Sequence, residues 1–244
     1  MRFAIFGKPF SDTHSELTYA IFDILKSYND YILADQDYFH FLEEQQPGRT
    51  IFCDELIRDD VFQADVVISI GGDGTFLRSL TFVRGSRIPV AGINFGRLGV
   101  LTTARSEDEE QWIDDLLAGR FRIEDRSLLK AECADLPEDI YPYALNEISL
   151  QRNGAGVLSI GISIDGRELP AYWADGLVVS TPPGSTAYNL SVGGPIVLPE
   201  SEVTTIVPIA PHNLNIRPLV VPVTSVIEMT FSAREESARL TVDN

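Results

Sequence analysis

The sequence is poor in cysteine and histidine. Its two cysteines, Cys53 and Cys133, lie far apart and form no Cys-x-x-Cys pattern, which excludes a disulfide framework and a thiolate zinc site. It has three histidines, and none lies beside the serines considered below, so a serine nucleophile activated by histidine is poorly supported. We expect both cysteines to be small buried residues of a protein from a reducing, cytoplasmic compartment.

Basic residues are also scarce. The 244 residues include 19 Lys and Arg against 36 Asp and Glu, a formal charge of −17. Such a field disfavours nucleic acid and anionic membranes as partners, because each phosphate approached must be neutralised by a cation. If the protein handles phosphates, it must therefore use backbone amides, a few basic side chains and bound cations.

Long hydrophobic runs are missing as well. The apolar run at 3–7 ends at Lys8 and Pro9 and is too short for a signal peptide. The longest uncharged stretch, 176–199, contains four prolines and four glycines. This composition indicates a loop-rich segment and not a membrane span.

The hydrophobic content of 44% supports a sizeable core, and its pattern changes along the chain. Strand-like runs at 2–6, 66–70 and 88–93 alternate with helical spacing, which predicts an open parallel α/β sheet. Capping-box sequences, Thr13-x-x-Glu16 and Ser106-x-x-Glu109, precede two of the expected helices. The later segments with strand periodicity are 121–133, 143–152, 157–164, 203–210, 219–223, 226–231 and 239–242. We therefore predict an α/β domain over 1–105, and over 106–244 a helix followed by a mainly β, sandwich-like domain.

Gly71-Gly72-Asp73-Gly74-Thr75 follows the buried run 66–70 and precedes a helical pattern. Glycines permit close backbone approach, and a helix N-terminus favours an anion, so this segment predicts a phosphate cradle without a Walker lysine. A carboxylate there repels phosphate unless it binds a cation or accepts a proton from an attacking hydroxyl. The alternative is a ligand-free Asp-Gly turn, which is disfavoured because a helix and not a strand follows.

Two further segments carry polar side chains suited to a nucleoside. Asn146-Glu147 lies inside an alternating strand pattern, which places its side chains on opposite faces of the strand or at a bulge. The pair offers an amide and a carboxylate for ribose hydroxyls, although, taken alone, a polar pair on an edge strand is the favoured explanation. The segment 175–189 combines a Pro-Pro-Gly bend with the hydroxyls of Ser185, Thr186 and Tyr188. Clustered hydroxyls and an aromatic ring favour nucleoside binding, and a plain Ser/Thr turn is the alternative.

Together these residues resemble the NAD kinase family. The segments Gly71–Thr75, Asn94–Thr102, Asn146-Glu147, Asp175–Tyr188, Gly193-Gly194-Pro195 and Pro211–Pro222 occur in the order and spacing of that family. Gly-Gly-Asp-Gly-Thr is shared with lipid kinases and phosphofructokinases, whereas the segment from Asp175 to Tyr188 is much more specific.

The resemblance implies a fold, a reaction and roles for individual residues. It implies an N-terminal α/β domain, a C-terminal β domain, NAD bound between them, and transfer of the ATP γ-phosphate to the 2′-hydroxyl of the adenosine ribose to give NADP. Asp73 would be the catalytic base or orienting group, and Gly71, Gly72, Gly74 and Thr75 would bind the donor phosphates. The residues implied for NAD binding are Asp73, Gly74, Asn146, Glu147, Asp175, Thr186, Ala187 and Tyr188.

Mg²⁺ is implied as the cation that offsets the phosphate charge, with ATP as co-substrate and with no metal ligand assigned among the protein residues. A homo-oligomer, a dimer or tetramer, is also implied. Because the family continues beyond the strand at 239–242 with further strands and a tail, we expect the chain to be truncated at its C-terminus.

Two other classes of function remain open at this point. A lipid or sugar kinase that shares only the glycine loop would need a broad apolar groove or an arginine cluster for a sugar phosphate, and the nucleoside-like segment argues against both. A non-catalytic dinucleotide sensor would tolerate the loss of Asp73, whose presence favours catalysis.

Overall fold

The computed structural model forms two compact units, Met1–Glu124 and Asp125–Asn244. It describes residues 1–9, 15–94, 99, 101–102, 104–105, 109–137, 140–154, 156–213, 215–232 and 237–243. The units divide after Glu124, whereas the sequence analysis places a boundary after residue 105. Helix α4 (Glu109–Leu117) lies in the first unit because its Ile113 and Leu116 are buried in the same core cluster as side chains of the helix near the N-terminus.

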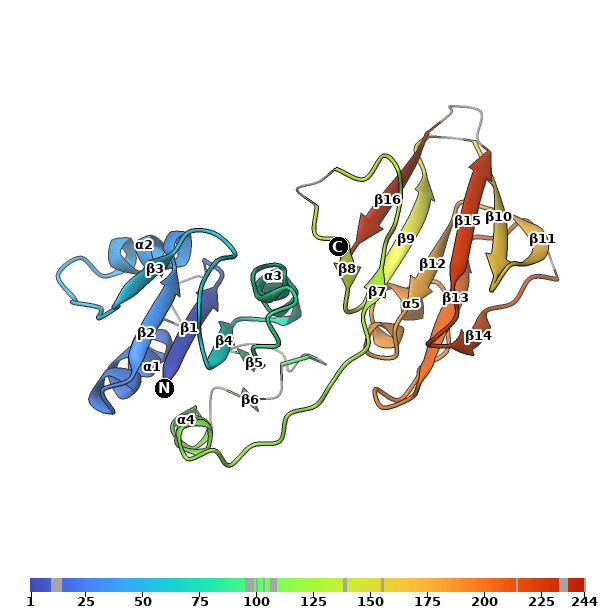
Figure 1. Cartoon of the computed structure of the whole chain (residues 1–244). Coiled ribbons are helices and arrows are strands. Elements are labelled where there is room, and N and C mark those ends of the chain that lie inside the picture. Colours follow the sequence, from blue (N-terminus) through green and yellow to red (C-terminus); the bar gives the residue numbers. More distant parts are fainter. Residues whose placement is uncertain are drawn as a thin grey trace. The chain divides into compact units, whose positions relative to one another are not determined.

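The first unit is built on a six-stranded sheet in the order β3-β2-β1-β4-β5-β6 (Figure 1). Every neighbouring pair is parallel. The strands are β1 Arg2–Gly7, β2 Tyr31–Asp35, β3 Glu55–Ile57, β4 Val66–Ile70, β5 Val90–Asn94 and β6 Ala104–Arg105. The predicted parallel α/β sheet is confirmed. Successive strands run outward from β1 on one side and from β4 on the other, so the order reverses between β1 and β4, where such sheets bind ligands at the carboxyl ends of the strands.

Helices cover both faces of this sheet. The helices are α1 Ser15–Ser27, α2 Gln36–Gln45, α3 Asp73–Val83 and α4. Alternate residues of β1 divide between two core clusters: Phe3 and Ile5 pack with side chains of α1, α2 and α4, while Ala4 and Phe6 pack with side chains of α3. Burial on both faces explains why β1 after Arg2 and β4 apart from Ser69 are apolar in sequence.

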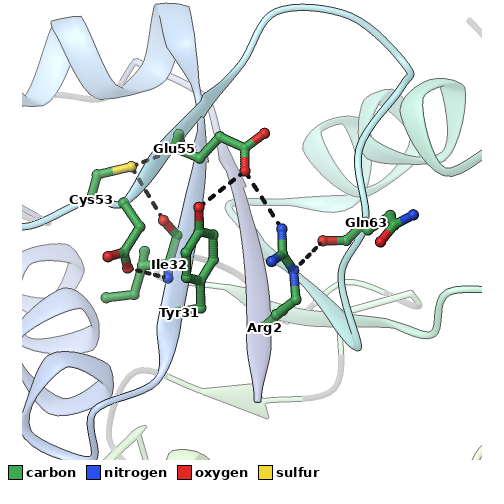
Figure 2. Close-up of polar contacts among 7 residues, drawn as sticks. Arg2, Tyr31, Ile32, Cys53, Glu55 and Gln63 are labelled. Carbon is green, nitrogen blue, oxygen red and sulfur yellow. Dashed lines mark hydrogen bonds and ion pairs between the residues drawn. The ribbon is translucent and has the colours of Figure 1, made fainter.

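The amino ends of three strands are tied together by polar contacts at the edge opposite the carboxyl ends (Figure 2). The Arg2 guanidinium lies 4.2 Å from the centre of the Tyr31 ring and 3.5 Å from a Glu55 carboxylate oxygen. The Tyr31 hydroxyl donates to Glu55 at 3.3 Å, and the Cys53 thiol donates to the Glu55 carbonyl at 3.0 Å. Each of these polar groups has a partner within the protein, so this edge of the sheet has a structural role.

The second unit consists of antiparallel sheets. A five-stranded sheet has the order β14-β13-β12-β9-β16, a three-stranded sheet has the order β11-β10-β15, and β7 pairs with β8. The strands are β7 Leu129–Lys130, β8 Tyr143–Ala144, β9 Glu147–Arg152, β10 Leu158–Ile164, β11 Arg167–Ala174, β12 Gly176–Ser180, β13 Val203–Ile209, β14 Leu219–Pro222, β15 Ile227–Ser232 and β16 Ala238–Val242. Leu150 and Leu177 from the larger sheet share a core cluster with Ile160 and Tyr172 from the smaller one. The two sheets therefore pack face to face, which confirms the sandwich-like prediction (Figure 1).

Several local predictions can be compared with these strands. The predicted hairpin turn at Asp165-Gly166 is confirmed, with φ of 51° and 76° at the two residues, as a two-residue turn of this kind requires. The predicted strand over 121–133 is wrong for most of its length, because only Leu129–Lys130 pairs with another strand. The predicted strand over 143–152 is broken between Ala144 and Glu147.

Other expectations involve the cysteines, the capping boxes and membrane spans. Cys53 is partly buried, but Cys133 is exposed, so the expectation that both are buried is wrong for Cys133. Thr13 and Ser106, which begin the two capping boxes, lie outside the described residues. Within the described parts of the chain, no helix has the length and apolar character needed to cross a membrane.

Candidate functional site

The Gly71–Thr75 segment connects β4 to α3 at the carboxyl edge of the parallel sheet. Gly71 has a φ of +145°, and a Cβ there would lie 2.5 Å from the Thr75 hydroxyl, so only glycine fits. Gly72 is the N-cap residue of α3 and supplies no side-chain cap for the first amides of the helix. An uncapped helix N-terminus reached by a tight glycine turn can bind an anion through backbone N–H groups. The predicted arrangement of strand, glycine turn and helix is confirmed, and phosphate binding at this turn stays a prediction.

Gly74 differs from Gly71 in its surroundings. A Cβ on Gly74 would meet no atom within 4 Å. Its φ also lies outside the left-handed region. Neither packing nor backbone conformation therefore requires glycine at this position, which leaves close approach of a ligand as a physical reason for it.

Asp73 is the first residue of α3, and its carboxylate lies against the segment after β5. Its Oδ1 accepts hydrogen bonds from the backbone N–H of Leu101 at 3.2 Å, from the N–H of Thr102 at 3.3 Å and from the Thr102 hydroxyl at 3.3 Å. A Cβ on Gly99 would lie 2.0 Å from the same oxygen, so a glycine is needed there. The segment Asn94–Thr102, one of those that carry the family resemblance, is thus in contact with Asp73, although residues 95–98 and 100 lie outside the described parts.

Asn146 and Glu147 lie at the break between β8 and β9, and the strand after them pairs with β12. Glu147 is opposite Ser180 in this register. The Asn146 carbonyl accepts from the Thr181 N–H at 2.9 Å and from the Ser180 hydroxyl at 3.2 Å. A Cβ on Gly184 would lie 2.0 Å from that carbonyl, so the Pro-Pro-Gly bend packs directly on it. The structure therefore brings together two segments that are far apart in sequence.

The residues after this bend differ in burial. Ser185 and Asn189 are fully buried and bond within the protein. Asn189 donates to the Ser185 and Pro195 carbonyls at 3.0 and 3.1 Å and accepts from the Thr205 hydroxyl at 2.9 Å. Between them lie Thr186, Ala187 and Tyr188, which are half-buried. The three residues predicted to bind NAD are thus the more accessible part of a firmly held turn.

Glu147 is the most unusual charged residue of this region. It is 6% exposed, and its Oε2 has no hydrogen-bond partner among the described residues. Burial and the nearby Asp243 carboxylate raise the pKa of Glu147 to about 7, although the Tyr188 N–H, which donates to it, acts in the opposite direction. A buried carboxyl oxygen without a partner can accept a hydrogen bond from a ligand hydroxyl.

The structure places Asp175 apart from these groups. It precedes β12, whereas Ser180 and Glu147 lie at the other end of the paired strands, about 17 Å away at the usual rise per residue. Its carboxylate lies 3.0 Å from the Arg152 Nε. Within one chain, Asp175 is therefore not adjacent to Asn146 and Glu147.

Two groups near the candidate residues were missed by sequence reasoning. Asp35, at the carboxyl end of β2, is 3% exposed and lies 3.4 Å from an Arg78 guanidinium nitrogen, and burial raises its pKa. Asp243, after β16, accepts hydrogen bonds from the amides around Asn146. Asp35 also accepts the Tyr38 N–H at 3.0 Å as the N-cap of α2, a local role that an Asp before a helix signals. Its pairing with Arg78 and the contacts of Asp243 have no sequence signal, because those partners come from distant parts of the chain.

Comparison with known proteins places both units in one family. The model of the ATP-NAD kinase N-terminal domain matches residues 3–121, and that of the ATP-NAD kinase C-terminal domain matches residues 145–244. The NAD kinase of Bacteroides fragilis is 39% identical over 244 residues, covering 100% of this chain and 84% of the relative. The NAD kinase of Flavobacterium psychrophilum is 38% identical over 248 residues, with the same coverage of 100% and 84%.

Solved structures agree with this assignment. Yeast NADH kinase complexed with NADH matches with a TM-score of 0.81 and 26% identity, covering 100% of this chain and 75% of that chain. An NAD kinase from Archaeoglobus fulgidus in complex with ATP matches with a TM-score of 0.71 and 29% identity, covering 100% and 87%. With both domains matched in sequence and the fold shared along its length, this chain belongs to the ATP-NAD kinase family.

Proposed function

We propose that the protein is an NAD kinase that transfers the γ-phosphoryl group of ATP to the 2′-hydroxyl of the adenosine ribose of NAD, giving NADP and ADP. The proposal rests on family membership together with one observation of the site, the Asp73 carboxylate at the start of α3 beside an uncapped helix N-terminus. This arrangement sets a proton acceptor next to a phosphate cradle, which is what transfer to a hydroxyl needs.

Asp73 serves the acceptor hydroxyl in this mechanism. Its carboxylate accepts a hydrogen bond from the 2′-hydroxyl and takes the proton as the hydroxyl oxygen bonds to the γ-phosphorus, while the bond from that phosphorus to the ADP oxygen breaks. The hydrogen bonds from Leu101 and Thr102 fix the carboxylate before substrate arrives. The turn Gly71–Thr75 holds the donor phosphates. The N–H groups of Gly71 and Thr75 already donate to the Ile93 and Gly72 carbonyls at 2.9 Å, so we propose that the Gly72 and Gly74 amides face the phosphates while Gly71 and Thr75 shape the turn.

The second unit supplies the groups that bind the nucleoside. The Asn146 and Glu147 side chains form hydrogen bonds with ribose hydroxyls. The half-buried turn binds the adenine and ribose through Thr186, Ala187 and Tyr188. We keep Asp175 as a proposed NAD contact. Because its carboxylate pairs with Arg152, it would have to exchange that ion pair for the ligand.

Mg²⁺ belongs in this proposal as part of the Mg–ATP co-substrate. The described residues contain no cluster of three or more His, Cys, Asp or Glu side chains that could hold a metal ion. Phosphate oxygens are ligands that Mg²⁺ prefers, so we propose that the cation is carried by the ATP phosphates, where it neutralises their charge. We further propose a homo-oligomer and, from the two free cysteines, a reducing cytoplasmic location.

A coupled assay tests the function. Purified protein is incubated with Mg–ATP and NAD, and NADP is detected with an NADP-specific dehydrogenase. We expect NADP to form, and none to form when a diacylglycerol or a sugar replaces NAD as the acceptor. Folded protein that makes no NADP from NAD would contradict the proposal.

A further inference from the structure

Asp243 holds three successive backbone amides on the neighbouring strand. Its carboxylate accepts the N–H of Leu145, the N–H of Asn146 at 2.7 Å and the N–H of Glu147 at 3.0 Å. Its own N–H donates to the Glu147 carbonyl at 3.0 Å, and its φ is +49°. The left-handed backbone turns this residue out of strand β16, and its side chain bonds N–H groups at the break between β8 and β9.

The same break is held from its other side by β12. The Ser180 hydroxyl and the Thr181 N–H donate to the Asn146 carbonyl, while the Asp243 carboxylate accepts from the Asn146 N–H. The two peptide groups that flank Asn146 are thus fixed by partners on opposite sides. Because the backbone on both sides of Asn146 is constrained, the directions in which the Asn146 and Glu147 side chains leave it are constrained as well.

We propose that Asp243 is a positioning residue for NAD binding, which orients Asn146 and Glu147 through their backbone amides. The inference rests on the proposed function, because it assumes that Asn146 and Glu147 bind NAD. Asp243 itself does not touch the substrate in this account.

The electrostatics of the pair agree with this role. The Glu147 carboxyl is buried, and its Oε2 has no partner among the described residues. The groups acting on it are the Asp243 carboxylate beyond β16, which raises its pKa, and the Tyr188 N–H on the α5 (Tyr188–Ser191) side, which lowers it. The β12 side presents the Ser180 and Thr181 hydroxyls, which do not titrate near neutral pH. Removing the Asp243 charge should therefore lower the pKa of Glu147 and move the pH dependence of NAD binding to lower pH.

Asp243→Asn tests the proposal, with Thr241→Val as a matched control. The Asn side chain keeps the shape but turns an N–H₂ group toward amide donors. Thr241 lies on the same strand, and its hydroxyl bonds the Ser149 hydroxyl on β9 at 2.6 Å, so its substitution also weakens the β16–β9 pair. Both variants should melt at lower temperature than wild type, which makes the comparison fair.

The two roles predict different binding behaviour. If Asp243 positions the site, Asp243→Asn raises the NAD dissociation constant and KM about tenfold, the factor that corresponds to about 1.4 kcal/mol. The KM for ATP should stay near wild type, and the midpoint of the pH dependence of NAD binding should fall. Thr241→Val should keep the wild-type NAD affinity and midpoint. Asp243→Asn protein with lower thermal stability but unchanged NAD affinity and midpoint would overturn the proposal.

A second variant and a direct binding measurement keep the test decisive. If Asp243→Asn does not fold, Asp243→Glu keeps the charge but displaces the carboxylate by one methylene, and a wild-type NAD affinity in that variant would overturn the proposal. NAD binding is measured by calorimetry without turnover. If wild-type protein binds NAD but makes no NADP, the proposed function is contradicted, while the role of Asp243 in NAD binding can still be tested. If wild-type protein binds no NAD, the proposed function and the role of Asp243 are both contradicted.

Discussion

Asp73 combines a structural and a proposed catalytic role, and a single substitution separates them. Asparagine retains an Oδ1 that can accept from Leu101 and Thr102, so the segment around it should stay in place. The loss of a general base lowers the rate by about 10²–10⁴. We expect Asp73→Asn to lower kcat by that factor with a near-normal NAD dissociation constant.

The control for Asp73 is Thr102→Val, which removes the hydroxyl that donates to Asp73 but keeps the side-chain shape. It should lower the melting temperature slightly and retain most of kcat. If Asp73→Asn retained more than about a tenth of wild-type kcat, the barrier would have changed by less than about 1.4 kcal/mol, and Asp73 would not be the catalytic base.

Gly74 gives a second test at this scale. Because a Cβ there meets no atom within 4 Å, Gly74→Ala should leave the melting temperature unchanged or raise it, through a gain of about 0.4–1 kcal/mol. The methyl group would still obstruct a phosphate, so the KM for ATP should rise about tenfold or more. Gly85→Ala, also without an atom within 4 Å, is the matched control and should leave the KM unchanged. Equal KM values in both variants would remove Gly74 from the phosphate site.

Glu147 links stability to pH. Its folded-state pKa of about 7 lies above the unfolded value, so the folded state binds more protons between about pH 4.3 and 7. Stability from this group is therefore present at low pH and lost as pH rises through 7, by up to about 4 kcal/mol. We expect Glu147→Gln to flatten this dependence and to weaken NAD binding at pH 8. Urea unfolding of wild type and Glu147→Gln at pH 5 and pH 8 measures the free energy of unfolding. The same change between the two pH values in both proteins would contradict the raised pKa of Glu147.

At the scale of elements, the sequence predicts those helices, strands and turns whose signals come from residues close together in the chain. The β4–α3 unit was predicted because Gly71-Gly72 separates a buried β-branched run from helical spacing, and both signals are local. For Asn146-Glu147 the sequence leaves a continuous strand and a bulge as alternatives, and it cannot choose the break between β8 and β9, because Asp243 and Thr181, which hold it, come from distant segments. The strand predicted over 121–133 alternates in sequence but pairs only at Leu129–Lys130, since periodicity cannot show whether a partner strand is present.

Asn189 is one of the buried side chains that hold the turn after β12. Its side chain joins the Ser185 and Pro195 carbonyls and the Thr205 hydroxyl. Asn189→Ala leaves these buried groups without a partner and should lower the free energy of unfolding by about 1–3 kcal/mol. It should also weaken NAD binding, because Thr186, Ala187 and Tyr188 lie on this turn. Asn153→Ala, at an exposed position, is the control, and equal effects of the two substitutions on denaturation would contradict this role.

At the scale of the whole molecule, the charge of −17 agrees with the way the candidate site handles phosphate. Many of the basic side chains already face carboxylates, including Arg2, Arg49, Arg84 and Arg152. The cradle at Gly71–Thr75 relies on backbone amides and a helix N-terminus, which need no net positive charge. An acidic chain can therefore bind a nucleotide whose phosphates carry their own cation.

Ligand binding should stabilise the whole chain in a way that separates binding from chemistry. A ligand that binds only the native state adds about 2.7 kcal/mol when its concentration is 100 times its Kd. At about 2–4 °C per kcal/mol for a chain of this size, NAD should raise the melting temperature by roughly 5–10 °C. Asp73→Asn should show the same shift, because the contacts proposed for residues 146–147 and 186–188 persist, whereas Glu147→Gln should show a smaller one. A melting temperature unchanged by millimolar NAD and NADP would contradict the dinucleotide site, since binding to the native state must raise the free energy of unfolding.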